Sequence, residues 1–295
     1  MMYLFACILI GYLLRKFRVL REDADTMISR LVNYVFVPGL ILNSFYNHCN
    51  PESLSQNLPL LLYCVVLLAL CAGIGFLLAP RFAEKPEQKG IYLYSFTVVN
   101  FGFMGNALIQ GLLGEDVLFR YLIFTMPASV FCYSVGVIWL TAGKKKFHPR
   151  MLINPMFITM IIGIVLGMTG CPLPSFATRT MSALAGCYSP LTMILTGYVI
   201  AGFDLKELLL KKQIYLLTLI RIVIMPLVIF FAAKAIGISG MPLTFILFFT
   251  AMPLGLNTIV YPAAYGGDKT PGAAMAVISN IAGLVTVPLI LSLVL

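Results

Sequence analysis

Two short polar motifs interrupt otherwise apolar stretches of the sequence. The first reads Asn100-Phe-Gly-Phe-Met-Gly-Asn106, and the second reads Pro253-Leu-Gly-Leu-Asn-Thr258 and is followed by Tyr261-Pro262. Gly and Pro weaken or break the hydrogen-bond ladder of a helix, while Asn supplies neutral amide donors. Helix N-termini bind anions, because their free N–H groups carry partial positive charge. The two motifs therefore predict an anion-binding site that needs no buried charge.

The composition indicates what kind of protein must position these motifs. Of the 295 residues, 60% are hydrophobic and 11% are charged, and the mean hydropathy is +0.98. So many apolar residues exceed what a core can bury, which excludes a soluble globular protein as well as a disordered chain. The seven cysteines are scattered and form no CxxC motif, so they are predicted to be packing residues and not metal ligands. A polytopic helical membrane protein remains.

Ten uncharged stretches have about the length needed to cross 30 Å of hydrocarbon. They lie near 2–14, 31–47, 57–79, 91–114, 118–141, 151–169, 180–202, 213–235, 243–265 and 272–294. The first is short, so that either Lys16 snorkels to the interface or the chain starts upstream. A cleaved signal peptide is not expected, because the basic residues follow the first apolar run instead of preceding it.

The distribution of Lys and Arg orients these stretches in a membrane. With the N-terminus outside, sixteen of the 20 basic residues fall in loops predicted to be cytoplasmic, and three fall in the opposite loops. We therefore predict a multi-pass protein of the cytoplasmic (inner or plasma) membrane with both termini outside. The same clustering in short loops argues against nucleic acid as a partner, although the net charge is +9.

The basic loop 144–150 divides the ten stretches into five and five. We predict one transporter fold made of two five-helix repeats, residues 1–143 and 151–295, joined by this cytoplasmic loop. An odd number of spans in each half gives the halves opposite orientations, as in the inverted repeats of secondary transporters. The two polar motifs then occupy matching fourth and ninth helices, which predicts a site near the membrane midplane. The alternative is that Gly and Asn only permit close helix packing.

Four segments carry a resemblance to a known family. They are Gly11-Tyr-Leu-Leu-Arg-Lys16, Leu31-Val-Asn-Tyr-Val-Phe-Val-Pro38, the first polar motif, and Ala251-Met-Pro253 through Tyr265-Gly-Gly-Asp268. In their order and spacing, the chain resembles the auxin efflux carrier family, which includes the plant PIN proteins and bacterial permeases for malate or malonate. The resemblance implies ten helices in two inverted five-helix repeats, with broken, crossing fourth and ninth helices. It also implies elevator-type transport of small organic anions, and relatives suggest a homodimer.

The resemblance also bears on individual residues. Asn100 matches the crossover asparagine of the plant carriers, and Pro253 matches the proline of the second crossover. The chain departs from the family after the first crossover glycine, where a proline is usual and Asn106-Ala107 stands here.

The predicted substrate-binding residues come from both motifs. They are Asn100, Gly102, Gly105, Asn106, Pro253, Gly255 and Asn257. We expect the asparagines to donate hydrogen bonds to a carboxylate, and the glycines and proline to keep the helices broken so that backbone amides face the site. Arg221 is the one charge inside a predicted span: it either snorkels or bonds backbone carbonyls, or it attracts the anion along its path.

No acidic residue falls inside the predicted spans, so no proton relay or dedicated cation site is evident. We therefore predict a uniporter of a small organic anion, such as a dicarboxylate, driven by the membrane potential, with no cofactor and no metal. A proton-coupled carrier remains open. A sodium-coupled symporter is another alternative, for which Ser279 and Asn280 are polar enough.

An enzyme is not expected, because neither HExxH nor GxSxG nor a pair of membrane carboxylates occurs. The predicted partners are the organic anion and the lipid bilayer. Glu115–Asp116 and Asp268 are expected to begin the helices that follow them, since acids favour helix N-termini.

Overall fold

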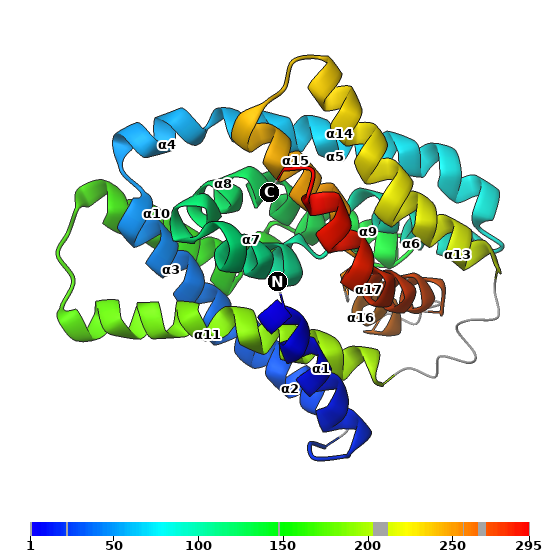
Figure 1. Ribbon diagram of the computed structural model, residues 1–295, viewed down its shortest axis with the longest axis horizontal. Helices are drawn as coiled ribbons and strands as arrows, with labels where there is room; N and C mark the ends of the chain where they lie inside the picture. The colour runs from blue at the N-terminus through cyan, green and yellow to red at the C-terminus, as the bar shows by residue number, and fades with distance from the viewer. Residues whose placement is uncertain are drawn as a thin grey trace. The chain divides into compact units, whose positions relative to one another are not determined.

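The computed structural model describes residues 2–21, 23–146, 148–202, 212–255, 257–264 and 270–294. Within these ranges the chain is helical and has no β-strand, as predicted (Figure 1). The helical segments of the first half are α1 (Met2–Lys16), α2 (Ala24–Leu31), η1 (Val32–Phe36), α3 (Val37–His48), α4 (Pro51–Asn57), α5 (Pro59–Phe82), α6 (Pro86–Thr97), η2 (Phe101–Gly105), α7 (Asn106–Leu113), α8 (Glu115–Phe131), η3 (Cys132–Gly136) and α9 (Val137–Leu140). Those of the second half are η4 (Pro149–Leu152), α10 (Pro155–Thr169), α11 (Ser175–Ile200), α13 (Lys212–Leu219), η5 (Ile220–Ile224), α14 (Met225–Ala235), α15 (Gly240–Ala251), α16 (Asn257–Ala264) and α17 (Thr270–Leu291).

Each of the ten predicted stretches coincides with one helix or with consecutive helical segments. Among the described residues, seven helices are long and apolar enough to cross a membrane, and α10 and α15 are shorter apolar helices. The apolar helix α1 has 15 residues and ends with Arg15 and Lys16. The all-helical architecture is thus confirmed and includes seven candidate membrane spans, while the count of ten spans and the inverted repeat stay predictions.

The helices form two compact units, and each unit draws on both halves of the sequence. The first unit contains Met1–Leu60, Gly102–Phe124 and Leu152–Gly202, and the second contains Leu61–Phe101, Thr125–Met151 and Phe203–Leu295. The predicted repeats, residues 1–143 and 151–295, are segments related by internal symmetry, whereas the two units are groups of residues in close contact. The two divisions of the chain therefore describe different properties, and the repeats stay a prediction.

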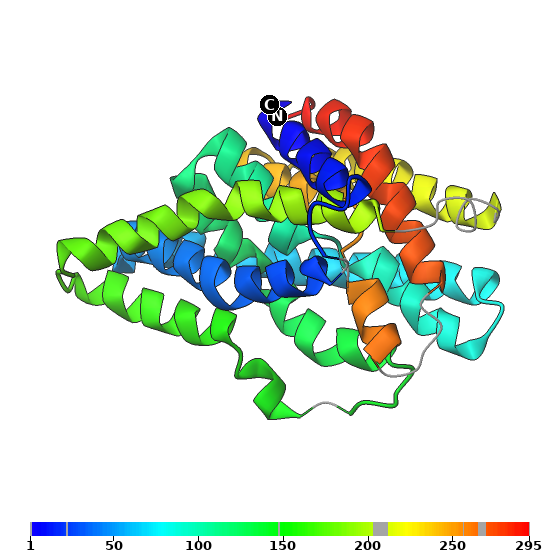
Figure 2. The ribbon, with the colours of Figure 1, turned by 90° about the horizontal axis from the view of Figure 1, so that it is seen from below.

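In the first unit, α11 packs against α1, α3 and α7. Figures 1 and 2 both show α1 lying along α11. Two glycines permit this contact: a Cβ added to Gly11 would lie 1.9 Å from the Ile194 carbonyl oxygen, and one added to Gly197 would lie 1.8 Å from the Ile8 carbonyl oxygen. The two helix backbones are therefore in direct contact, as small residues allow between membrane helices.

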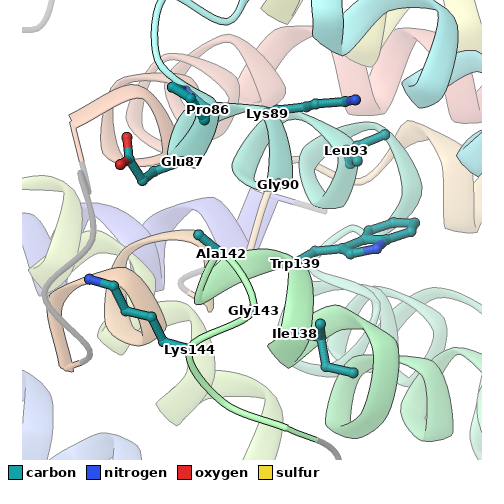
Figure 3. Close-up of a pocket in the computed structure, with 10 residues that line it drawn as sticks. All are labelled: Pro86, Glu87, Lys89, Gly90, Leu93, Ile138, Trp139, Ala142, Gly143 and Lys144. Atoms are coloured by element: carbon teal, nitrogen blue, oxygen red, sulfur yellow. The ribbon is translucent and has the colours of Figure 1, made fainter.

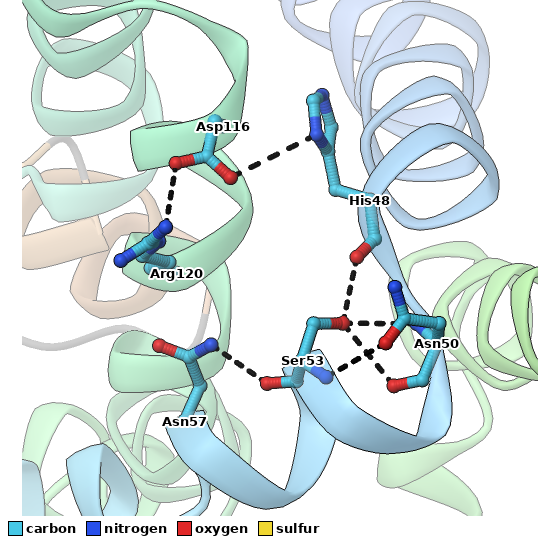
Figure 4. Close-up of polar contacts among 6 residues, drawn as sticks. All are labelled: His48, Asn50, Ser53, Asn57, Asp116 and Arg120. Atoms are coloured by element: carbon cyan, nitrogen blue, oxygen red, sulfur yellow. Dashed lines mark hydrogen bonds and ion pairs between the residues drawn. The ribbon is translucent and has the colours of Figure 1, made fainter.

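A capping box joins α3 to α4 in the same unit. The Asn50 side-chain oxygen accepts from the backbone N–H of Ser53 at 2.8 Å, and the Ser53 hydroxyl accepts from the backbone N–H of Asn50 at 2.9 Å. The same hydroxyl donates to the His48 carbonyl oxygen at 2.7 Å. The His48 ring nitrogen lies 3.9 Å from an Asp116 carboxylate oxygen, and Asp116 pairs with Arg120 at 2.9 Å (Figure 4). Acidic residues open α8 here, as the sequence predicted.

In the second unit, α17 packs against α6, α13, α15 and α16. Every residue from 271 to 280 is buried, which places the first half of this helix in the core of the unit. Small residues permit the contact: a Cβ added to Gly272 would lie 2.3 Å from the Thr258 carbonyl oxygen of α16. Likewise, a Cβ on Gly90 of α6 would lie 2.0 Å from the Trp139 carbonyl oxygen of α9.

Two helices widen into a π-turn just before a proline. The π-turn η1 precedes Pro38, and the π-turn η5 precedes Pro226. Proline cannot donate a backbone hydrogen bond, and its ring pushes away the carbonyl four residues earlier, so one extra residue is accommodated in the turn. The second of these turns contains Arg221.

Two expectations lie outside the described residues. Asp268, predicted to begin the tenth helix, falls between the described ranges. The same holds for Tyr265-Gly-Gly, which belongs to the second segment of the family resemblance.

Candidate functional site

The fourth predicted span breaks between Thr97 and Phe101. The helix α6 ends at Thr97, and Val98 is extended with φ −120° and ψ 140°. Consecutive β-branched residues, here Val98 and Val99, favour an extended backbone over a helix. The helical path resumes at Phe101 with the wide turn η2. The sequence suggested that Gly102 and Gly105 would form the break, but these glycines lie in η2, after it.

The ninth predicted span breaks after Ala251, where α15 ends. Met252 is extended, with φ −65° and ψ 142°. Pro253 explains this, because a proline restricts the residue before it to extended conformations and cannot itself donate to the helix ladder. The helix α16 begins at Asn257. A helical segment thus follows each break, and the N–H groups of its first turn have no partner within that segment.

The two breaks meet inside the second unit. The backbone N–H of Asn100 donates to the Pro253 carbonyl oxygen at 2.8 Å. A Cβ added to Gly255 would lie 3.8 Å from the Cβ of Asn100, which is an ordinary contact distance. The rings of Phe101 and Phe249, which flank the breaks, stack with their centroids 5.7 Å apart. Of the predicted site residues, the structure therefore brings Asn100, Pro253 and Gly255 together.

Side chains of α17 satisfy the irregular backbone of the second break. The backbone N–H of Leu254 donates to the Ser279 hydroxyl at 3.1 Å. The backbone carbonyl oxygen of Leu254 accepts from the side-chain nitrogen of Asn280 at 3.1 Å. All three residues are buried. Because buried backbone groups need hydrogen-bond partners, these two neighbouring side chains make the non-helical backbone at Leu254 tolerable inside the protein. The Asn280 amide oxygen is buried and has no hydrogen-bond partner among the residues that the structure describes.

Asn257 is linked to the helix before the first break. Its side-chain amide donates to the Tyr94 hydroxyl of α6 at 2.9 Å. The same hydroxyl lies 3.4 Å from the Cys132 sulfur. The first residue of α16 is thereby tied to α6, so four of the seven predicted residues belong to one connected group in the second unit.

Arg221 connects the ends of the two helices that precede the breaks. Its Nε donates to the Ser95 carbonyl oxygen of α6 at 3.0 Å, and one terminal nitrogen donates to the Thr250 carbonyl oxygen of α15 at 2.8 Å. The side chain is fully buried. Bonding of backbone carbonyls was one of the two roles that the sequence left open for Arg221. The other, attraction of an anion along its path, stays a prediction.

The remaining predicted residues, Gly102, Gly105 and Asn106, belong to the first unit. There the Tyr188 hydroxyl of α11 donates to the Gly102 carbonyl oxygen, and the Asn106 side chain is a hydrogen-bonding neighbour of the same hydroxyl. One residue along α11, the Ser189 hydroxyl donates to the Ala107 carbonyl oxygen at 3.0 Å. A Cβ on Gly105 would lie 2.8 Å from the Tyr121 hydroxyl oxygen.

A pocket of about 460 Å³ lies in the second unit at the start of α6 and the end of α9 (Figure 3). Lys89 and Lys144 line it together with Glu87 and Trp139. These residues neighbour the basic loops that the sequence assigns to the cytoplasmic side. None of the predicted substrate-binding residues lines this pocket.

Among the described residues, the group around the breaks offers hydrogen-bond donors and contains no acidic side chain. Its described members supply backbone amides, asparagine amides and a tyrosine hydroxyl. In the part of the chain that the structure describes, no three His, Cys, Asp or Glu side chains gather as metal ligands. The arrangement is suited to bind a group rich in oxygen acceptors, and it has no nucleophile–base pair.

Sequence reasoning missed three contributors to this group: Tyr94, Ser95 and Thr250. The latter two act through backbone carbonyls, which leave no trace in side-chain type. Ser279 and Asn280 did stand out as adjacent polar residues in an apolar stretch, but the sequence could not reveal that Leu254 is their partner.

Known proteins provide an independent comparison. A family model described as "Membrane transport protein" matches residues 1–151 and 144–291. An uncharacterized transporter of Methanocaldococcus jannaschii is 27% identical over 276 residues, which cover 88% of this chain and 87% of the relative. One of Methanothermobacter thermautotrophicus is 22% identical over 285 residues, or 96% of this chain and 93% of the relative. An uncharacterized transporter of Schizosaccharomyces pombe is 32% identical over 154 residues, covering 49% of this chain and 34% of that protein. The chain belongs to the membrane transport protein family, the auxin efflux carrier family whose motifs it carries.

Proposed function

We propose that this chain is a secondary transporter that moves a small organic anion, such as a dicarboxylate, across the cytoplasmic membrane. The observation that carries the proposal is the junction of the two breaks, where the Asn100 amide donates to the Pro253 carbonyl oxygen at 2.8 Å. A helical segment starts directly after each break. Helix starts supply free N–H groups and partial positive charge, which suit a carboxylate.

The charge of the group also supports an anion as substrate. The described residues around the breaks contain no carboxylate that would repel an anion or bind a metal cation. Asn100 and Asn257 can donate to a carboxylate without the large cost of burying a charge in the membrane. Outward movement of one negative charge would gain about 2.3 kcal/mol per 100 mV of membrane potential. We therefore favour a uniporter driven by this potential.

An elevator-type movement is part of the proposal. In such a mechanism one compact body carries the site across the membrane. The second unit contains both breaks, the arginine that links α6 to α15, and the two α17 side chains that hold Leu254. These contacts make the unit a candidate for the moving body. Both termini outside and a homodimer belong to the same proposal.

Binding to the purified protein is the first test. Thermal unfolding is measured in detergent with malonate, malate or an indole-type acid, each in sodium-containing and in sodium-free buffer. Stabilisation by a dicarboxylate in both buffers is expected, because a ligand that binds only the folded state raises its stability. No stabilisation by any of these acids would remove the support for an organic anion as substrate.

Transport in vesicles tests the driving force. Uptake of the stabilising acid is measured with an imposed membrane potential and no proton gradient, and then with a proton gradient and the potential clamped at zero. Uptake in the first condition alone is expected for a uniporter. Uptake that depends on the proton gradient at zero potential would instead favour a proton-coupled carrier.

A sodium-coupled symporter is the second candidate, and one observation favours it. The Asn280 amide oxygen is buried without a partner among the described residues, while the nitrogen of the same side chain donates to the Leu254 carbonyl oxygen of the second break. Oxygen ligands of this kind, with unwound backbone carbonyls, bind sodium in other secondary transporters. Stabilisation by the acid only in sodium-containing buffer would favour this candidate over the uniporter.

A further inference from the structure

Arg221 occupies an unusual place for a charged residue. It lies in the π-turn η5, is 0% exposed, and has no acidic partner among the described residues. A buried guanidinium without a counter-charge is very costly in a membrane protein unless other groups replace its hydration. The structure therefore has to supply negative electrostatic potential from another source.

The two helix ends supply that potential. Thr97 is the last residue of α6, and Ala251 is the last residue of α15. Arg221 donates to a carbonyl oxygen in the last turn of each, at Ser95 and Thr250. Each helix C-terminus carries roughly half a negative charge and up to four carbonyl groups without a helical partner. Two such ends together offset the single positive charge of the guanidinium.

The same two helices run directly into the breaks. Asn100 follows the end of α6 by three residues, and Pro253 follows the end of α15 by two. Fixing the two C-terminal ends on one planar guanidinium therefore fixes the distance between the two extended segments. Arginine suits this task better than lysine, because its donors form a rigid fork and not a rotating point charge.

We propose that Arg221 is the positioning residue of the site: its guanidinium clamps the C-terminal ends of α6 and α15 and so keeps the two breaks in contact. The consequence for transport rests on the proposed function, but the clamp itself does not. One terminal nitrogen of Arg221 has no hydrogen-bond partner in the described part of the chain. A role for Arg221 as the counter-charge of the substrate is therefore the rival that the test must exclude.

The distance between the breaks can be measured by cysteine cross-linking. Cβ atoms about 3.8 Å apart suit a disulfide, and a Cβ on Gly255 lies 3.8 Å from that of Asn100. Asn100→Cys and Gly255→Cys are combined in a background in which the exposed Cys171 and Cys187 are Ser. The initial rate of disulfide formation in purified protein without substrate is followed by peptide mass spectrometry. This rate reports the position of the breaks and does not depend on substrate binding.

Three variants of Arg221 and one control are compared in this background. Arg221→Met and Arg221→Gln are expected to lower the cross-linking rate at least about tenfold, since the charge that joins the two ends is lost. Arg221→Lys is expected to recover part of the rate, because it keeps the charge but not the fork. Lys234→Met removes an exposed positive charge from α14, which continues the same helix, and is expected to leave the rate unchanged.

The outcomes separate the clamp from its rival and from the proposed function. Parental cross-linking rates in Arg221→Met and Arg221→Gln would overturn the clamp. If Arg221→Met does not accumulate, the comparison of Arg221→Lys with Arg221→Gln tests the clamp by itself. Equal cross-linking rates in these two variants would also overturn the clamp. The rival role leaves the substrate-free rate unchanged and lowers only affinity. If no organic acid is bound or moved by the unmodified protein, the proposed function fails while the cross-linking result stands.

Discussion

The hydroxyl of Ser279 offers a quantitative test of how the second break is held open. It accepts the hydrogen bond of the Leu254 amide at 3.1 Å, and both residues are 0% exposed. In Ser279→Ala this amide stays buried without a partner, which costs about 1–3 kcal/mol. The second bond of the hydroxyl, to Ala276 in its own helix, adds little. A cost of this size changes the equilibrium between closed and locally open backbone about 5- to 150-fold.

Amide hydrogen exchange measures this equilibrium at the break itself. A peptide covering residues 252–255 contains three backbone amides, because Pro253 has none. In Ser279→Ala we expect the Leu254 amide to exchange about 5- to 150-fold faster, since exchange follows the local opening free energy. Thermal unfolding in detergent should shift to a lower temperature in the same variant.

Two control variants separate the hydrogen bond from other effects of the substitution. Ser279→Thr keeps the hydroxyl and should retain most of the protection. Ser134→Ala removes a serine that bonds only carbonyl groups of its own helix, so protection at residues 252–255 should be unchanged. Unaltered exchange at Leu254 in Ser279→Ala would refute the idea that α17 side chains hold the break.

Four further substitutions test other parts of the structure. Gly197→Ala should lower thermal stability markedly, because its Cβ would lie 1.8 Å from a carbonyl oxygen of α1. The control Gly186→Ala has no atom within 4 Å of its Cβ, so the higher helix propensity of alanine should raise stability by up to about 1 kcal/mol. Tyr188→Phe removes the donor to the Gly102 carbonyl oxygen and should cost about 1–3 kcal/mol in denaturant unfolding. Asn100→Ala should keep its fold and membrane abundance but lose uptake into vesicles; normal uptake at equal abundance would move the site elsewhere.

The helices and the approximate positions of the breaks were predictable, because both leave a pattern in residue types. A run of uncharged residues must be helical in a bilayer, where no water can satisfy an open backbone. Pro253 marks the second break directly, since it restricts Met252 and cannot donate. The first break was placed a few residues too late. Its strongest signal was the glycines Gly102 and Gly105, whereas the helix ends at Thr97 and the residue after it, Val98, is extended.

The contacts within the site were not predictable, because most of them join a side chain to the backbone of a distant segment. The bond from Arg221 to the Thr250 carbonyl oxygen spans 29 residues, and the bond from Arg221 to the Ser95 carbonyl oxygen spans 126. Any residue type offers the same carbonyl, so sequence alone identifies the donor but not its acceptor. The same reasoning applies to Ser279 and Asn280, which were recognised as polar while Leu254, their partner, is indistinguishable from other leucines in its stretch.

In the second unit, charges and helix-end partial charges of opposite sign lie next to one another. Within this unit, the C-termini of α6 and α15 end before the breaks and carry partial negative charge, whereas the start of α16 carries partial positive charge. The buried Arg221 lies on carbonyl groups of the C-terminal ends, so its charge neutralises the partial charges that would repel an anion. The described residues on either side of the α16 start, 249–255 and 257–264, include no acidic side chain that would balance its charge. In the proposed function, an exchangeable substrate anion bound at the breaks would complete this balance.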